Sequence, residues 1–157
     1  MTIQALTLDR KADFEALFLP YFQELEANEP QPLSPQVITG KILPFVLGQW
    51  EKGIIRIDLC LAEDTAFGFA IYQIDAPESD WCKRPGWGFI REFYIRPESR
   101  RKGFGHAMAA HVVAALKDMG TAQVYLTSDN AVAFWQRCGF TDETPEAAGS
   151  HTLSMSL

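Results

Sequence analysis

The hydrophobic positions between residues 14 and 25 follow the spacing of a helix. Six apolar or aromatic residues recur three or four positions apart and define one face: Phe14, Leu17, Phe18, Tyr21, Phe22 and Leu25. Pro20 falls inside this pattern. Because a proline ring clashes with the preceding turn, we expect a kink there or a division into two short helices.

A second helix is predicted to begin at Ser34-Pro35. Serine suits the N-cap position and proline suits the first helical position, so this pair favours a helix running toward Leu43. Pro44 and Gly48 follow directly. We therefore expect the stretch up to Gly53 to be irregular.

Runs rich in β-branched and aromatic residues occupy the middle of the chain. Residues 54–61 and 67–74 are separated by Glu63-Asp64-Thr65, which predicts a hairpin. Residues 75–86 contain two prolines and are expected to form a loop. A third run, residues 87–95, ends shortly before Pro97, which cannot donate to a sheet.

The remaining elements complete an alternation of strands and helices. We expect strands at residues 2–8, 124–127 and 153–157, and helices at residues 103–119 and 130–138. Gly120 and Gly139 stand where the two helices should stop. This order predicts an α+β fold in one domain, residues 1–157, with a central mixed, mostly antiparallel sheet flanked by helices.

Composition sets broad limits on the class of protein. The chain has 157 residues, of which 47% are hydrophobic, as in ordinary soluble proteins. It contains no apolar run of the roughly 20 residues that cross a bilayer, and its first nine residues lack a secretion signal. Three widely spaced cysteines, Cys60, Cys82 and Cys138, argue against a disulfide framework or structural zinc. We expect a cytoplasmic protein without membrane contact.

The distribution of charge points to a small anionic ligand. The net charge of −6 disfavours nucleic acid as a partner, because such binding requires neutralised phosphates. Residues 96–102 nevertheless hold four basic residues and one acidic residue, a local +3, and subtracting it leaves −9 for the remaining chain. One compact positive spot on an acidic body suits a polyanion of limited size.

This positive spot lies between a predicted strand and a predicted helix. The helix N-terminus exposes unpaired N–H groups, and Gly103 and Gly105 leave room for phosphate oxygens. Arg100, Arg101 and Lys102 add charge. A P-loop is excluded because no Lys-Ser or Lys-Thr follows Gly105, and a dinucleotide fingerprint is excluded because position 108 is methionine.

The chain at this point resembles the GNAT superfamily of N-acetyltransferases. The family signature is Gln or Arg, two residues, Gly, one residue, then Gly or Ala, and Arg100-x-x-Gly103-x-Gly105 satisfies it. Upstream, residues 92–97 (Glu-Phe-Tyr-Ile-Arg-Pro) are similar to the family's fourth strand. Downstream, residues 131–140 are similar to its late helix and the Gly-Phe that follows. The order of elements agrees over essentially the whole chain.

The resemblance implies an acetyl-CoA-dependent enzyme and a pose for that co-substrate. Pyrophosphate would lie on the loop made by Arg100, Arg101, Lys102, Gly103, Phe104, Gly105 and His106. The pantetheine arm would lie along Phe93, Tyr94 and Ile95 like an added strand. A backbone N–H of Tyr94 or Ile95 would face the acetyl carbonyl. Ser128 stands where many relatives have an asparagine that touches the arm. Asn130, for which a helix-cap role is favoured, and Trp135 complete the predicted contacts.

Acyl transfer to an amine requires a base, because free amines are mostly protonated near neutral pH. Glu92 is the first candidate for the base, and an exposed or ion-paired strand carboxylate is the competing interpretation. Asp75, Asp80 and Asp129 are weaker candidates. Relatives often use a tyrosine of the late helix to protonate the thiolate. Here that position is Trp135, so Tyr94, Tyr125 or solvent would have to substitute.

The predicted function is acetyl transfer from acetyl-CoA to a primary amine by direct attack in a ternary complex. Two alternatives stay open: a catalytically impaired acyl-CoA-binding sensor or interaction module, and a binder of a different phosphate compound. No metal is expected, because His106 and His111 point in different directions on their helix and His151 stands alone. The acceptor is a small-molecule or peptide amine, for which Glu24, Glu26 and Glu29 could provide negative charge. A homodimer is possible by analogy with the family.

Overall fold

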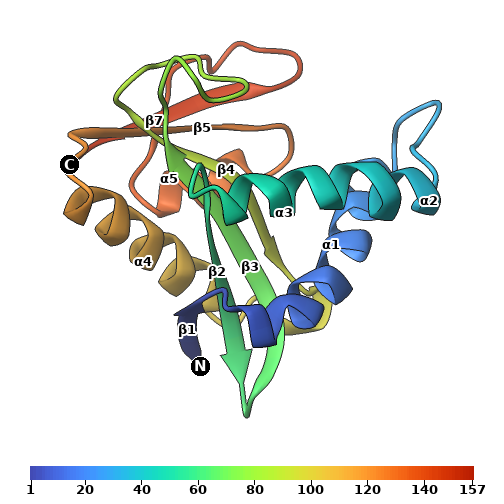
Figure 1. Cartoon of the computed structure of the whole chain (residues 1–157). Coiled ribbons are helices and arrows are strands. Elements are labelled where there is room, and N and C mark those ends of the chain that lie inside the picture. Colours follow the sequence, from blue (N-terminus) through green and yellow to red (C-terminus); the bar gives the residue numbers. More distant parts are fainter.

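A seven-stranded sheet organises the computed structural model, which describes residues 1–157 (Figure 1). The strand order is β1-β2-β3-β4-β5-β7-β6, and every neighbouring pair is antiparallel except β4 and β5. The strands are β1 (Thr2–Ala5), β2 (Arg56–Ala62), β3 (Thr65–Ile74), β4 (Gly88–Ile95), β5 (Gln123–Ser128), β6 (Thr141–Asp142) and β7 (His151–Ser156). The predicted mixed, mostly antiparallel sheet is therefore confirmed, although the two-residue β6 was not predicted.

Helices cover both faces of this sheet (Figure 1). One face carries α1 (Lys11–Leu25) and α3 (Leu43–Glu51), and the other carries α4 (Phe104–Asp118) and α5 (Val132–Arg137). Shorter helical segments are η1 (Leu8–Arg10), α2 (Pro35–Val37), η2 (Ile38–Ile42) and η3 (Pro97–Ser99). None of the helices combines the length and the apolar character needed to cross a bilayer.

Two expectations about the first half of the chain need correction. Helix α1 is one helix that contains Pro20, so the division into two short helices is wrong. The stretch through Pro44 and Gly48 is also helical rather than irregular. The reason lies just before Pro44: η2 is a π-helix, in which the N–H of Leu43 donates to the carbonyl of Ile38 five residues earlier. This wider turn lets the chain continue through a proline that lacks an N–H.

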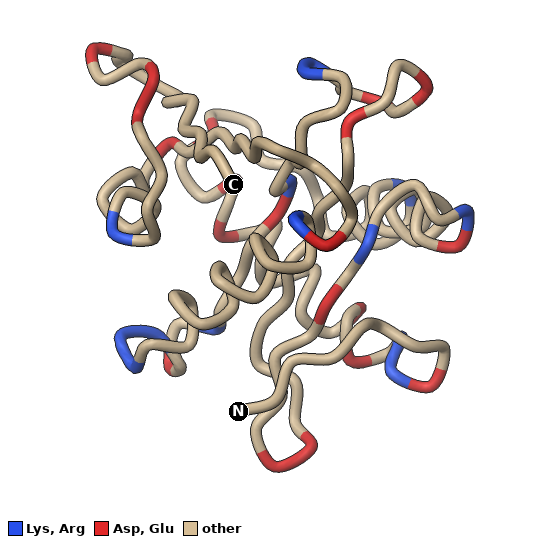
Figure 2. Tube along the Cα trace, turned by 90° about the vertical axis from the view of Figure 1, so that its left-hand side faces the viewer, with Lys and Arg blue, Asp and Glu red and all other residues tan.

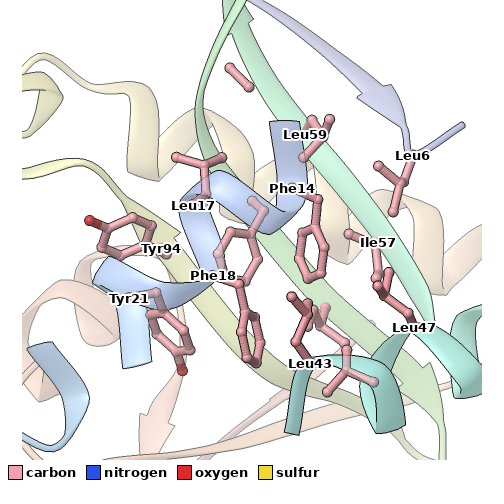
Figure 3. Close-up of a cluster of buried hydrophobic side chains, with 14 of the residues drawn as sticks. Leu6, Phe14, Leu17, Phe18, Tyr21, Leu43, Leu47, Ile57, Leu59 and Tyr94 are labelled. Atoms are coloured by element: carbon pink, nitrogen blue, oxygen red, sulfur yellow. The ribbon is translucent and has the colours of Figure 1, made fainter. Parts of the chain in front are cut away.

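The apolar face of α1 forms the centre of the first core (Figure 3). Phe14, Leu17 and Phe18 are at most 1% exposed and pack against strands β2 and β3. The rings of Phe14 and Phe69 meet edge to face at 5.0 Å. Burying each such side chain is worth about 1.5–3 kcal/mol, so this face fixes α1 on the sheet. A second core under α4 contains Met108, Val112 and Leu116.

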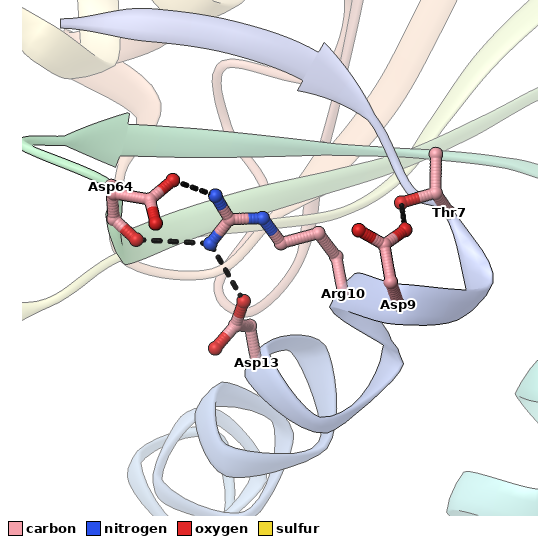
Figure 4. Close-up of polar contacts among 5 residues, drawn as sticks. All are labelled: Thr7, Asp9, Arg10, Asp13 and Asp64. Atoms are coloured by element: carbon pink, nitrogen blue, oxygen red, sulfur yellow. Dashed lines mark hydrogen bonds and ion pairs between the residues drawn. The ribbon is translucent and has the colours of Figure 1, made fainter.

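The predicted hairpin is confirmed, with a tighter turn than expected. Only Glu63 and Asp64 separate β2 from β3, and both have positive φ, 49° and 68°. Two consecutive left-handed residues are the mark of a type I′ turn, which matches the twist of paired strands. Arg10 then attaches this turn to the start of α1: it pairs with Asp13 at 3.0 Å and with the carboxylate and the carbonyl of Asp64 (Figure 4).

Strands β4 and β5 pair over a short distance and then separate. Their parallel pairing covers two positions, Gly88 with Val124 and Phe89 with Tyr125. From Ile90 to Ile95, the β5 side of β4 has no neighbouring strand. Figure 1 shows the two strands diverging beyond this contact. The divergence leaves backbone hydrogen-bonding groups of a central strand without a strand partner, and it defines the region of the candidate site.

Candidate active site

A β-bulge in β4 places two charged side chains on the same face of the sheet. Ile71 of β3 lies opposite Glu92, whereas the next residue, Tyr72, lies opposite Ile90, so Arg91 is the extra residue. Ile90 belongs to the core under α4. Arg91 instead bonds to α3, and Glu92 bonds to α1. Bulges commonly re-aim side chains in this way, and here the result is a cation and a carboxylate side by side.

The carboxylate of Glu92 has a single protein donor. The hydroxyl of Tyr21, on α1, donates to Oε2. The other oxygen, Oε1, has no donor and is not sealed from solvent. Burial raises the pKa of Glu92 above its usual value, against smaller opposing effects from Tyr21 and Arg91. An accessible carboxylate with a raised pKa is a better base than an ordinary surface glutamate.

Tyr94, the other predicted catalytic residue, has its ring in the core. The ring packs against Tyr21 at 5.4 Å and against Phe69 at 5.8 Å. Figure 3 shows the hydroxyls of Tyr94 and Tyr21 pointing in different directions. Burial raises the pKa of Tyr94, and the Arg100 guanidinium lies 5.7 Å from its ring centroid. The ring of Tyr94 therefore lies beside the first basic side chain of the loop that follows β4.

This basic loop presents a row of unpaired backbone donors. The N–H groups from Arg101 to His106 make no hydrogen bond to any backbone carbonyl, and α4 has no side-chain cap. The first helical bond in this region runs from Ala107 to the carbonyl of Gly103. Six consecutive free donors at the start of a fifteen-residue helix are the groups with which a helix N-terminus can bind an anion. The tube in Figure 2 is blue over the loop that precedes α4.

The two glycines of the loop have different reasons to be glycine. Gly103 has φ +84°, and a Cβ there would meet no protein atom within 4 Å, so the space beside it is open. Gly105 was expected to leave room for phosphate. A Cβ at Gly105 would lie 3.2 Å from the ring of Phe134 on α5, so close packing between helices already explains this glycine. Of the two glycines, only Gly103 is required by the backbone shape of the loop, in which Arg101 also has a positive φ of 62°.

The basic side chains of the loop also divide into two kinds. Arg100 is engaged with the protein: it pairs with Glu24 of α1 at 2.8 Å, and its Nε donates to the carbonyl of Ile95 at 2.8 Å. Arg101 and Lys102 are exposed and form no ion pair. Arg100 therefore anchors the loop, and Arg101 and Lys102 are the charges free to meet an anion.

The exposed edge of β4 points specific amides toward the gap beside β5. The N–H of Arg96 donates to the carbonyl of Phe67 on the β3 side. Because successive amides of a strand point to opposite sides, the N–H groups of Ile95 and Phe93 face the gap. The amide of Tyr94 faces β3. Of the two amides predicted to meet an acetyl carbonyl, the strand geometry thus favours Ile95.

The predicted contacts on β5 and α5 have mainly structural partners. Trp135 is 5% exposed, and its ring packs against Phe93 at 4.9 Å. The Oγ of Ser128 accepts from the N–H of Ala131, the N-cap residue of α5, at 3.1 Å, and no side chain caps the helix itself. Asn130 is exposed and makes no capping bond, so the cap role favoured for it is wrong.

Asp75, one of the weaker base candidates, is occupied by contacts of its own. Asp75 is 2% exposed and accepts bonds from the Gln73 side chain, from the backbone of Lys83 and Arg84, and from the Tyr125 hydroxyl. This network holds the β3–β4 loop. Burial and Asp75 raise the pKa of Tyr125, which makes it a poor proton donor.

Histidine and cysteine residues do not form a metal site. No group of three or more His, Cys, Asp or Glu side chains is arranged to hold a metal ion. The fold does bring His106 to Cys138, with Nδ1 3.6 Å from Sγ, a contact hidden in the sequence. Burial raises the pKa of the Cys138 thiol, so it is not an activated nucleophile.

The structure adds site residues that sequence reasoning did not identify. Tyr21 was recognised as part of an apolar helical face, but its hydroxyl reaches Glu92, 71 positions away. Gln49 of α3 accepts a bond from Arg91 at 2.7 Å. The competing interpretation of Glu92 as an ion-paired carboxylate is not met by its neighbour Arg91, because the two form no ion pair. No local pattern marks these contacts, because they join elements that meet only in the fold.

Comparison with known proteins places this arrangement in a family. The sequence model of the Acetyltransferase (GNAT) family matches residues 12–140, and the chain belongs to that family. No curated protein sequence matches the chain. The acetyltransferase activity and the use of acetyl-CoA predicted from the sequence are those of this family.

Solved structures share the fold at low sequence identity. PaiA N-acetyltransferase from Thermoplasma acidophilum, solved in complex with coenzyme A, is 16% identical, with full coverage of both chains and a TM-score of 0.72. An acetyltransferase from Thermus thermophilus is 15% identical, with 100% of this chain and 98% of that chain covered and a TM-score of 0.73. Ribosomal-protein-alanine N-acetyltransferase from Brucella melitensis is 12% identical, with full coverage of both chains and a TM-score of 0.70.

Proposed function

We propose that the protein transfers the acetyl group of acetyl-CoA to a primary amine by direct attack in a ternary complex, with Glu92 as the base. The observation that carries this proposal is the position of Glu92. Its accessible carboxylate, with a raised pKa, lies on the one strand whose free edge leads into an anion-binding loop. Acetyl transfer requires a base for the amine and donors for the carbonyl oxygen and the co-substrate. A base, a free strand edge and an anion site follow one another along β4 and the loop after it, and they match these requirements.

The loop and the strand edge fit coenzyme A in two parts. The free amides from Arg101 to His106, with the charges of Arg101 and Lys102, suit a pyrophosphate. The gap beside β4 suits an extended pantetheine arm, because an arm with amide groups can bond to the edge as a strand would. The thioester, when bound, supplies the acetyl group and a thiolate leaving group.

Residues of β4 have separate roles in the proposed reaction. Glu92 removes a proton from the acceptor amine, directly or through water, so that its lone pair can attack the acetyl carbon. The N–H of Ile95 or Phe93 stabilises the negative charge that develops on the carbonyl oxygen. Trp135 cannot protonate the departing thiolate, which leaves Tyr94 or solvent. Because an ordinary thiol has a pKa of about 8.5, its thiolate is a fair leaving group near neutral pH, and protonation of the thiolate is the least demanding step.

Replacement of Glu92 by glutamine tests the proposal. Glutamine keeps an acceptor for the Tyr21 hydroxyl but cannot take a proton. We expect kcat to fall by about 10²–10⁴-fold while the affinity for coenzyme A stays unchanged. Thiol release from acetyl-CoA with a broad panel of amines measures the first quantity, and calorimetric titration measures the second.

A matched variant separates the role of Glu92 from general loss of charge. Glu98→Gln removes a carboxylate from the same segment, but Glu98 is exposed and only loosely paired with Arg96, at 4.0 Å. Its kcat should equal that of the wild type. If Glu92→Gln keeps full turnover, Glu92 is not the base. If the wild type releases no thiol with any amine yet binds coenzyme A, the alternative of a sensor, motivated by buried Trp135, replaces the enzyme.

A further inference from the structure

The guanidinium of Arg91 is partly buried and lacks a carboxylate partner. Its Nη1 donates to Oε1 of Gln49 at 2.7 Å, and its Nε and Nη2 have no protein acceptor. These two nitrogens are not sealed from solvent. Asp80 does not pair with Arg91; it accepts a bond from Nε2 of Gln49 at 3.4 Å, the same side chain that accepts from Arg91. A partly desolvated cation with free donors is costly unless an anion binds it.

Arg91 and Glu92 are consecutive residues that face the same side. In a regular strand, consecutive side chains lie on opposite faces of the sheet. The β-bulge at Arg91 breaks this alternation, so both side chains lie on one face. Arg91 reaches α3 and Glu92 reaches α1, the two helices on that face. A cation with free donors and a candidate base therefore adjoin each other on the face of β4 that carries α1 and α3.

Two exposed aromatic rings lie next to the Arg91 guanidinium. The ring of Trp81 is 4.4 Å from its central carbon, and Phe45 of α3 meets Trp81 edge to face at 5.9 Å. Trp81 is 61% exposed and Phe45 is 45% exposed. Trp81 also has φ +60°, which is strained for a bulky residue and is more usual at functional sites. These rings offer an apolar surface beside the cation.

Arg91 is the cation among the carboxylates on this face of β4. It would repel an ammonium group placed beside it, while Asp80 lies nearby and accepts a bond from Gln49 at 3.4 Å. Glu24, one of three glutamates considered for cation recognition, is already paired with Arg100 at 2.8 Å. This face of β4 therefore combines one cation with free donors, one candidate base and an aromatic surface.

We propose that the amine acceptor is an α-amino acid with an aromatic or large apolar side chain. Its carboxylate binds the free donors of Arg91, its amine faces Glu92, and its side chain packs on Trp81 and Phe45. In an α-amino acid, amine and carboxylate share one carbon, so their partners must be neighbours, as Arg91 and Glu92 are. This assignment rests on the proposed acetyltransferase function.

Paired acceptors that differ by one carboxylate test the assignment. With saturating acetyl-CoA, kcat/KM is measured for phenylalanine against phenethylamine and for tryptophan against tryptamine. We expect the wild type to prefer each amino acid by at least about tenfold. Arg91→Gln should lower kcat/KM for phenylalanine by about 10–100-fold, mainly through KM, because it removes charge-assisted hydrogen bonds. The loss for phenethylamine should be much smaller, because this amine has no carboxylate for Arg91 to bind.

Two further variants serve as control and as independent check. Lys83→Gln removes one positive charge from the exposed β3–β4 loop, and we expect wild-type preferences. Trp81→Ala changes an exposed side chain, so the fold survives even where Arg91→Gln does not fold. It should reduce the preference for phenylalanine over alanine and keep the preference for phenylalanine over phenethylamine.

The outcomes distinguish failure of the amino-acid assignment from failure of the proposed acetyltransferase function. A wild type that acetylates phenethylamine as well as phenylalanine overturns the amino-acid assignment but leaves the acetyltransferase intact. Equal losses for both acceptors in Arg91→Gln overturn the role of Arg91 as the carboxylate site. Absence of thiol release with every amine overturns both proposals together.

Discussion

Gly103 offers a test of the anion-binding loop in which stability and ligand binding can be separated. Its φ of +84° is accessible to glycine at little cost, whereas an L-residue there loses about 1–2 kcal/mol. Gly103→Ala should therefore lower the free energy of unfolding by about 1 kcal/mol. For a domain of this size, that corresponds to a fall in Tm of about 2–4 °C.

The same substitution should weaken coenzyme A binding. The alanine Cβ enters open space beside six free amides, and relief of backbone strain would turn some of these amides away. A hydrogen bond to a charged group is worth about 1.5–3 kcal/mol, so the loss of one raises Kd by about tenfold or more. Calorimetric titration with coenzyme A measures this change.

The other end of α4 supplies the matched control. Gly120 follows the helix with φ +95° and open space around its Cβ position, so Gly120→Ala carries the same backbone cost. Its free energy of unfolding should also fall by about 1 kcal/mol, while its affinity for coenzyme A should equal that of the wild type. Gly149→Ala, in open space without positive φ, should change neither quantity. The reasoning is refuted if Gly103→Ala keeps wild-type affinity, or if Gly120→Ala loses affinity equally.

Two further predictions concern stability. The Arg84 hydrogen bonds lower the pKa of Glu143 to about 2, so the pair stabilises the fold above the unfolded pKa and loses this effect as pH falls toward about 2. Because the pair is exposed to solvent, Glu143→Gln should cost only about 0.5–1 kcal/mol at pH 7 in urea unfolding. The difference should shrink below about pH 4, and a constant difference would contradict this. A Cβ at Gly68 would lie 2.6 Å from the carbonyl oxygen of Tyr94. Gly68→Ala should therefore lower the free energy of unfolding by more than about 2 kcal/mol, and it should reduce activity because β4 is displaced. A urea midpoint equal to that of the wild type would contradict this prediction.

The sequence by itself determined the elements with strong local signals. The helical face of Phe14 to Leu25, the hairpin at Glu63-Asp64 and the glycine-containing loop before α4 were all predicted, because periodicity, turn residues and helix-start chemistry are local properties. Local reasoning failed at Pro44, where a preceding π-turn lets the helix continue. It also assigned a cap to Asn130, whereas no side chain caps α5.

Only the tertiary structure decided how the site is assembled. The bulge that turns Arg91 and Glu92 to one face depends on pairing with β3, and the gap beside β4 depends on the divergence of β5. The bond from Tyr21 to Glu92 joins residues that no local pattern connects. The proposed anion-binding loop could be recognised from consecutive residues. The neighbours of the proposed base, Glu92, could not, because their relation exists only after helices α1 and α3 pack on the sheet.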